Sequence, residues 1–156
     1  MALLLIIAMP LAAMAQEKAT VAEESKPVIL HGHVVCITEE LQRLYQVTPD
    51  CERRGHVYGL KTTDGKLYPF LPTDTAAAIF SDQRVREREL RVTARLFPQA
   101  PFIEVIKLQS LREGKLYDLY YYCEVCNITT HKPGHCVCCQ QEVEFRETPA
   151  EADNQP

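Results

Sequence analysis

The stretch ELRVTARLF, Glu89–Phe97, indicates the fold class of this 156-residue chain most clearly. Its apolar side chains fall at every second position: Leu90, Val92, Ala94 and Leu96. Because successive side chains of a β-strand point to opposite faces, this alternation predicts a strand with one buried face. Pro98 and Pro101 then indicate a turn, and residues 102–111 read as the next strand.

Three more strands are predicted before this stretch. Residues 28–38 are rich in β-branched residues, and Gly32 in their middle predicts a bend or a bulge. Residues 56–63 and 66–71 are two short strands that an Asp-Gly turn joins at Gly65. Since glycine tolerates a positive φ, this dipeptide is a strong hairpin signal.

Helical structure is expected at two places between the strands. Residues 39–47 carry apolar side chains at helical spacing and predict a short helix or a turn. Residues 76–80 predict a helical turn that Thr73 or Asp74 could cap. The mixed charges of residues 82–89 predict a solvated loop or a strand edge.

The expected order of elements is strand, strand, strand, helix, strand, strand. Over roughly residues 28–111 this order resembles the OB-fold, a small Greek-key barrel with a helix between its third and fourth strands. The resemblance implies a mostly β fold, with an OB-like antiparallel barrel and one short helix over residues 28–118. Another small antiparallel barrel or sandwich is the alternative.

Two C-x2-C pairs follow near the C-terminus, and their members are Cys123, Cys126, Cys136 and Cys139. Each such turn can bring two sulfurs to about 2.3 Å from one zinc ion. Pro133 and Gly134 supply a bend before the second pair. Strands over residues 117–122 and 142–145 would form the arms of a hairpin ribbon. The spacing therefore predicts a four-cysteine metal site with Zn²⁺ bound, and another transition metal is the alternative.

The segment from Tyr122 to Cys139 is similar to rubredoxin-like zinc ribbons. It resembles especially the short heavy-metal-binding modules of exported and membrane metal-handling proteins, which run Tyr-x-Cys-Pro-x-His and then Pro-Gly-x-Cys-Pro-x-Cys-Gly-Met. The resemblance implies a zinc ribbon over residues 119–147. Residues 140–141 are both glutamine where those modules have Gly-Met, so the glycine after the second pair and a soft ligand for copper are missing.

Oxidation competes with metal for these four sulfurs. In an exported protein they could instead form a disulfide framework, because that compartment is oxidising. A redox-active C-x2-C pair is the third interpretation, although such pairs favour a helix N-terminus and these follow strands. Metal-bound thiolates and disulfides exclude one another.

Three of the seven cysteines lie outside this set. Cys36 and Cys51 are predicted to form a disulfide, since the strands around them should be neighbours. The alternative is a thiol pair that binds a metal or cofactor together with His31, His33 or His56.

Five residues are candidate auxiliary ligands: Cys138, His131, His135, His31 and His33. The simplest interpretation of Cys138 is a spare thiol. The others are a substitute ligand, a disulfide to another chain, and a thiol that transfers metal. For the four histidines, solvated side chains are the simpler interpretation.

The first 15 residues are uncharged and mostly apolar, and they end in the small-x-small sequence Ala-Met-Ala. They predict a signal peptide over residues 1–15, with an uncleaved anchor or a core segment as alternatives. Residues 16–27 predict a disordered tether, and residues 148–156 a disordered tail. The expected product is exported, either periplasmic or secreted, and has no stable membrane span after cleavage.

Composition and motifs narrow the function. The net charge of −4 argues against a nucleic-acid partner. No Gly-rich phosphate loop, G-x-S-x-G or H-E-x-x-H motif is present, so no catalytic residue is assigned. The sequence predicts an exported, non-catalytic metal-binding protein with a structural zinc ribbon that serves as an interaction module. A protein or a glycan partner is left open. The alternatives are a metal-buffering or metal-transfer accessory protein and a thiol-disulfide redox protein.

Overall fold

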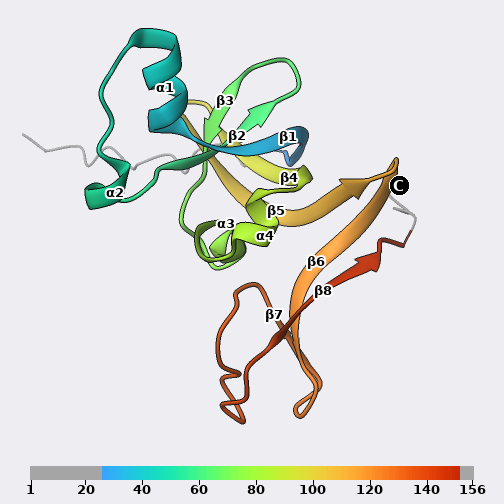
Figure 1. Ribbon diagram of the computed structural model, residues 1–156. Helices are drawn as coiled ribbons and strands as arrows, with labels where there is room; N and C mark the ends of the chain where they lie inside the picture. The colour runs from blue at the N-terminus through green and yellow to red at the C-terminus, as the bar shows by residue number, and fades with distance from the viewer. Residues whose placement is uncertain (1–25, 152–156) are drawn as a thin grey trace, which may run out of the picture.

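The computed structural model describes residues 26–151 (Figure 1). The predicted signal peptide and nearly all of the predicted tether lie outside the described residues. The strands of the described part are β1 (Val28–Cys36), β2 (Tyr58–Thr62), β3 (Leu67–Pro69), β4 (Glu89–Phe97), β5 (Ala100–Arg112), β6 (Lys115–Cys123), β7 (Ile128–Thr130) and β8 (Glu144–Pro149). Its helices are α1 (Ile37–Tyr45), α2 (Cys51–Arg54), α3 (Ala77–Ser81) and α4 (Gln83–Arg86). None of these helices is long and apolar enough to cross a membrane.

The strands form one antiparallel sheet in the order β3-β2-β1-β4-β5-β6-β7, with β8 paired to β6 outside that path. The prediction of a mostly β, antiparallel fold is confirmed. The sheet is open, so the predicted barrel is not supported. The terminal strand β3 approaches β5 through an isolated parallel bridge between Phe70 and Ile103, where the Leu71 N–H donates to the Ile103 carbonyl at 2.9 Å.

The core lies on one face of β4, as its alternation predicts. Leu90, Val92 and Ala94 are fully buried. They pack in one cluster with buried residues of the neighbouring strands and of the α3–α4 segment: Leu60, Ile79, Val85, Ile103 and Val105. The helices between β3 and β4 thus cover the apolar face of the sheet.

Residues 82–89 differ from the solvated loop that their charges predict. Asp82, at the start of α4, is only 7% exposed. Val85, within α4, is fully buried. The Asp82 carboxylate accepts hydrogen bonds from the buried Tyr121 hydroxyl at 2.6 Å and from the Arg84 guanidinium at 2.7 Å. These two partners satisfy a carboxylate that would otherwise be costly to bury.

Strand β6 belongs both to the sheet and to the C-terminal ribbon. Asp118 in its first half pairs with β5, and Tyr121 in its second half pairs with β7. Strand β8 runs along the other edge of β6 for both halves, so β5 and β7 follow one another along one edge. The boundary expected after residue 118 falls inside this continuous strand. Figure 1 shows β6 and β8 extending away from the sheet toward the two cysteine turns.

Strand β8 is also attached to the sheet by side chains. The Glu147 carboxylate accepts hydrogen bonds from the Arg88 guanidinium at 2.6 and 2.7 Å and from the Ser110 hydroxyl at 2.8 Å. The Arg84 guanidinium lies 4.7 Å from the centre of the Phe145 ring, which is a cation–π contact. These contacts hold the ribbon in place beside α4.

Candidate metal centre

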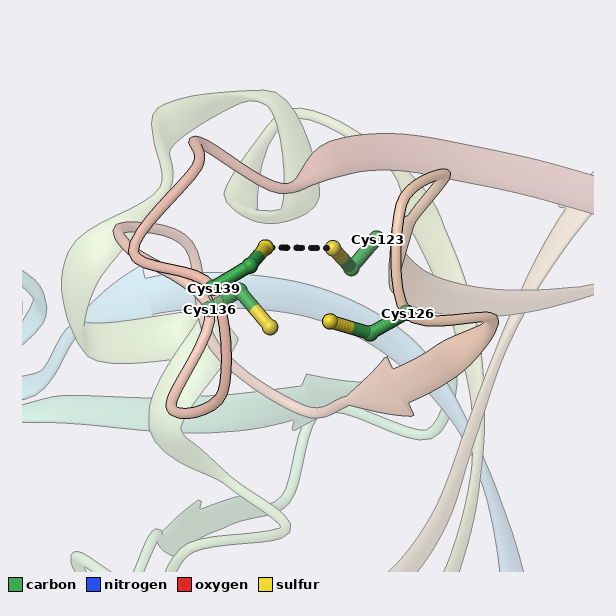
Figure 2. A group of neighbouring side chains, drawn as sticks. All are labelled: Cys123, Cys126, Cys136 and Cys139. Carbon is green, nitrogen blue, oxygen red and sulfur yellow. Dashed lines mark hydrogen bonds between the residues drawn. The ribbon is translucent and has the colours of Figure 1, made fainter.

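The first C-x2-C turn is the loop of the hairpin between β6 and β7. Cys123 is the last residue of β6 and pairs with Ile128. Between them the Asn127 N–H donates to the Cys123 carbonyl at 2.9 Å, and Asn127 has a φ of 55°. Asparagine is one of the few non-glycine residues that adopt this left-handed conformation readily. The tight turn leaves the side chains of Cys123 and Cys126 on one side of the hairpin (Figure 2).

The second C-x2-C turn repeats this geometry. Two arms lead into it, because the Val143 N–H donates to the Gly134 carbonyl at 3.0 Å and residues 135 and 142 form a bridge. The Gln140 N–H then donates to the Cys136 carbonyl at 3.0 Å, and Gln140 has a φ of 63°. Gln140 therefore occupies the position that Asn127 has in the first turn, and it takes the left-handed conformation without being glycine.

The two turns bring their four sulfurs together. Figure 2 shows the four cysteine side chains pointing toward one another from opposite loops. Their sulfurs all lie within 4.8 Å of one another, and the sulfurs of Cys123 and Cys139 are 3.4 Å apart. Four sulfurs at the corners of a tetrahedron, each about 2.3 Å from one zinc ion, would be about 3.8 Å apart. The donor set therefore fits a tetrahedral thiolate-bound metal ion.

Burial and backbone donors suit these thiols to a closed site. Cys123 and Cys136 are 1% and 2% exposed. Backbone N–H groups of Cys139 and Cys138 point at the Cys136 sulfur and lower the pKa of this thiol to about 6, against the opposing effect of burial. Hydrogen bonds with the Cys138 and Cys139 side chains raise the pKa of Cys126, and burial adds to this effect. A cation among the sulfurs would stabilise all four thiolates together.

The candidate auxiliary ligands near the ribbon lie outside this group of sulfurs. Cys138, His131 and His135 are all exposed. The His135 Nδ1 atom lies 3.1 Å from the Gln140 carbonyl oxygen and so helps to close the second turn.

His31 and His33 lie on β1 and are exposed. They share one face of the strand, as their spacing predicts. Neither belongs to a group of three or more close ligand atoms within residues 26–151.

The predicted disulfide between Cys36 and Cys51 is not formed. Their sulfurs are 3.7 Å apart, whereas a disulfide bond is about 2.05 Å long, and both residues are free thiols. Burial raises the pKa of Cys36, but hydrogen bonds from the Thr38 hydroxyl, the Glu39 N–H and His56 outweigh it and lower this pKa to about 7. The two sulfurs, a Glu39 oxygen and a His56 nitrogen form a second group of close ligand atoms.

Sequence reasoning singled out the four ribbon cysteines because their spacing is a motif. For the second group it named Cys36, Cys51 and His56 only as an alternative to a disulfide, and it missed Glu39, because these residues follow no recognised spacing. The available signal was the pair of odd cysteines on either side of a predicted helix, with His56 just beyond.

No family profile matches the chain, and no curated protein or solved structure is significantly similar to it. What can be said of the metal centre therefore comes from the arrangement of its own residues.

Proposed function

We propose that this chain is an exported, non-catalytic metal-binding protein in which residues 119–147 form a structural, rubredoxin-like zinc ribbon. The observation that carries the proposal is the convergence of four sulfurs from two equivalent turns. Four thiolates fill the coordination sphere of a tetrahedral zinc ion and leave no position for water. A metal held in this way stabilises a fold and does not activate a substrate.

The remaining β part of the chain is proposed to be OB-like. Two features support this: α3 and α4 lie between β3 and β4, and β3 approaches β5 in parallel at the bridge between Phe70 and Ile103. Both belong to the OB arrangement that the order of elements resembles.

The ribbon is proposed to contact a protein or glycan partner and not a nucleic acid. Val125 and Val137 support contact with a partner, because these apolar residues at the tips of the two turns are 69% and 84% exposed. Apolar side chains this exposed leave apolar surface that a partner could cover. The acidic net charge of −4 speaks against nucleic acid as the partner.

Export is proposed on the apolar sequence of residues 1–15 and its small-x-small end. The mass of the protein recovered from expression of the full chain tests it. Cleavage after residue 15 would leave Gln16 as the first residue, in the periplasm or the medium. Recovery of the uncleaved chain from the cytoplasm would contradict export.

The structural role is tested by metal analysis and chelation of the full chain. We expect Cys123→Ser to lose the ribbon metal and the ordered amide signals of residues 123–142, because folding of such a site is coupled to metal binding. Cys138→Ser is the matched control, since this cysteine is exposed and outside the group. Ordered turns in the metal-free wild type would contradict a structural role.

Exposed Cys138 also favours a second candidate function, the buffering or transfer of metal. Its thiol lies close enough to Cys126 to affect the pKa of that residue. A thiol in this position could receive metal from the site. Rapid exchange of the bound metal with an isotope in solution, slowed by Cys138→Ser, would support transfer, whereas slow exchange in both proteins supports a structural site.

A further inference from the structure

A second group of metal-binding side chains lies where β1 passes into the two N-terminal helices. Cys36 is the last residue of β1, and Glu39 lies in the first turn of α1. Cys51 begins α2, and His56 lies between α2 and β2. Figure 1 shows α1 and α2 away from the cysteine turns of the ribbon, so the two groups occupy separate parts of the molecule.

The ligand atoms of this group converge. The Cys36 and Cys51 sulfurs, a carboxylate oxygen of Glu39 and an imidazole nitrogen of His56 all lie within 4.8 Å of one another. The two sulfurs are 3.7 Å apart, close to the separation of about 3.8 Å that two thiolates have on a tetrahedral zinc ion. The His56 Nδ1 atom is 3.4 Å from a Glu39 carboxylate oxygen.

The surrounding structure holds these ligands in position. The Thr38 hydroxyl lies 3.0 Å from each of the two sulfurs. The Ile37 N–H donates to the Val57 carbonyl at 2.7 Å, which ties the start of α1 to the segment that carries His56. The His56 ring stacks on Tyr58, with ring centroids 5.6 Å apart and planes 11° from parallel. This stacking restricts the orientation of the imidazole.

We propose that Cys36, Cys51, His56 and Glu39 form a second binding site for a transition-metal cation of the zinc class. Two thiolates and one imidazole suit zinc, cobalt and related ions, while the carboxylate supplies a fourth, harder ligand. The site differs from the ribbon in its access to solvent. Cys36 is buried, but Glu39 and His56 are exposed, so the metal can be reached and exchanged from outside.

The site is tested by counting and characterising metal in the full chain under reducing conditions. We expect wild-type protein to bind two zinc or cobalt ions, and Cys36→Ser/Cys51→Ser to bind one. Cys123→Ser/Cys136→Ser should also bind one ion, in this case at the second site. The cobalt spectra of the two variants should differ, because one retains four sulfur ligands and the other retains two sulfurs, a nitrogen and an oxygen.

His56→Ala is the milder variant, since a surface histidine can be removed without disturbing the core. It should weaken the second site by about tenfold or more, because even changes to outer contacts of a metal ligand have effects of this size. His33→Ala, an exposed histidine on β1 outside both groups, should leave affinity and stoichiometry unchanged. These outcomes concern the second site alone and leave the ribbon proposal untouched.

Three results would overturn the second site. One is that the wild-type chain binds a single ion and that the Cys36→Ser/Cys51→Ser variant still binds it. Another is unchanged affinity in His56→Ala. The third is a Cys36–Cys51 disulfide in protein isolated without added oxidant, because oxidised sulfurs cannot act as thiolate ligands.

Discussion

Gln140 has a left-handed backbone conformation, which a non-glycine residue adopts only at a cost. Its φ of 63° closes the second cysteine turn. The heavy-metal-binding modules that this segment resembles have glycine at the same position. A non-glycine residue in this conformation costs roughly 1 kcal/mol relative to glycine. Part of this is offset locally, because the Gln140 side-chain amide donates to the Cys136 carbonyl at 3.2 Å.

Gln140→Gly should therefore stabilise the metal-loaded ribbon by up to about 1 kcal/mol, because glycine relieves the strain. Gln140→Val should destabilise it, since a β-branched residue fits a positive φ worst. Thermal unfolding of the metal-loaded chain measures both. Equal stability of the valine and glycine variants would show that the turn does not depend on this conformation.

Asp82 is a buried carboxylate whose contribution to folding stability should depend on pH. Its hydrogen bond with Arg84 lowers the pKa to about 2 from 3.8, and Tyr121 adds to this effect against the opposing cost of burial. Because the folded pKa is the lower one, the stabilisation from Asp82 is complete above the unfolded pKa. It is lost as the pH falls toward the folded value.

Asp82→Asn should destabilise the chain by about 1 to 3 kcal/mol at neutral pH, the usual range for hydrogen bonds to a charged group. The difference from wild type should shrink between pH 4 and pH 2, where the wild-type carboxylate becomes protonated. Urea unfolding at several pH values measures it. Asp74→Asn, at an exposed position before α3, is the control and should have a smaller effect. A constant difference at all pH values would contradict the assignment.

At the scale of elements, β1 and β2 approach one another closely at Gly32. A Cβ atom at this position would lie 2.1 Å from the Lys61 carbonyl oxygen, which is backbone and cannot turn away. The sequence predicts a bend or bulge here, and the structural requirement is the absence of a side chain beside β2.

Gly32→Ala should destabilise the chain by about 1 to 3 kcal/mol or more, because the strands must move apart to relieve the overlap. His33→Ala, on the exposed face of the same strand, should change stability by much less. Chemical denaturation of the two variants provides the comparison. An unaltered midpoint for Gly32→Ala would mean that β1 and β2 can separate freely.

The elements that could be predicted are those whose signal is local. The alternation of Glu89–Phe97 and the Asp-Gly turn at Gly65 both appear in the structure as expected. The segment around Asp82 could not be predicted, because its partner Tyr121 lies 39 residues away in the chain. Charged residues in such a segment indicate exposure to solvent unless a distant partner is known.

The same contrast between local and distant signals separates the two groups of candidate metal ligands. The ribbon cysteines are predicted because each turn positions two sulfurs by itself, and the second turn repeats the first. Cys36, Cys51 and His56 come together only because β1 pairs with β2 while the chain between them folds into α1 and α2. No spacing rule describes that arrangement.

At the scale of the whole molecule, one strand connects the candidate metal centre to the sheet. Strand β6 leaves β5 at the turn of Glu113 and Gly114, both with positive φ, and ends at Cys123 inside the metal centre. Strand β8 returns along it and is held to the sheet through Glu147. The ribbon is thus an extension of the sheet, and its far end has its own small core of sulfurs.

The central claim is that Cys123, Cys126, Cys136 and Cys139 share one metal ion, and cysteine alkylation read by mass spectrometry tests it most directly. With the full, zinc-loaded chain, we predict rapid labelling of exposed Cys138 and protection of these four thiols, lost when a chelator removes the metal. Labelling of the four as fast as Cys138 with zinc present would contradict the claim. So would disulfides among them in the protein as isolated.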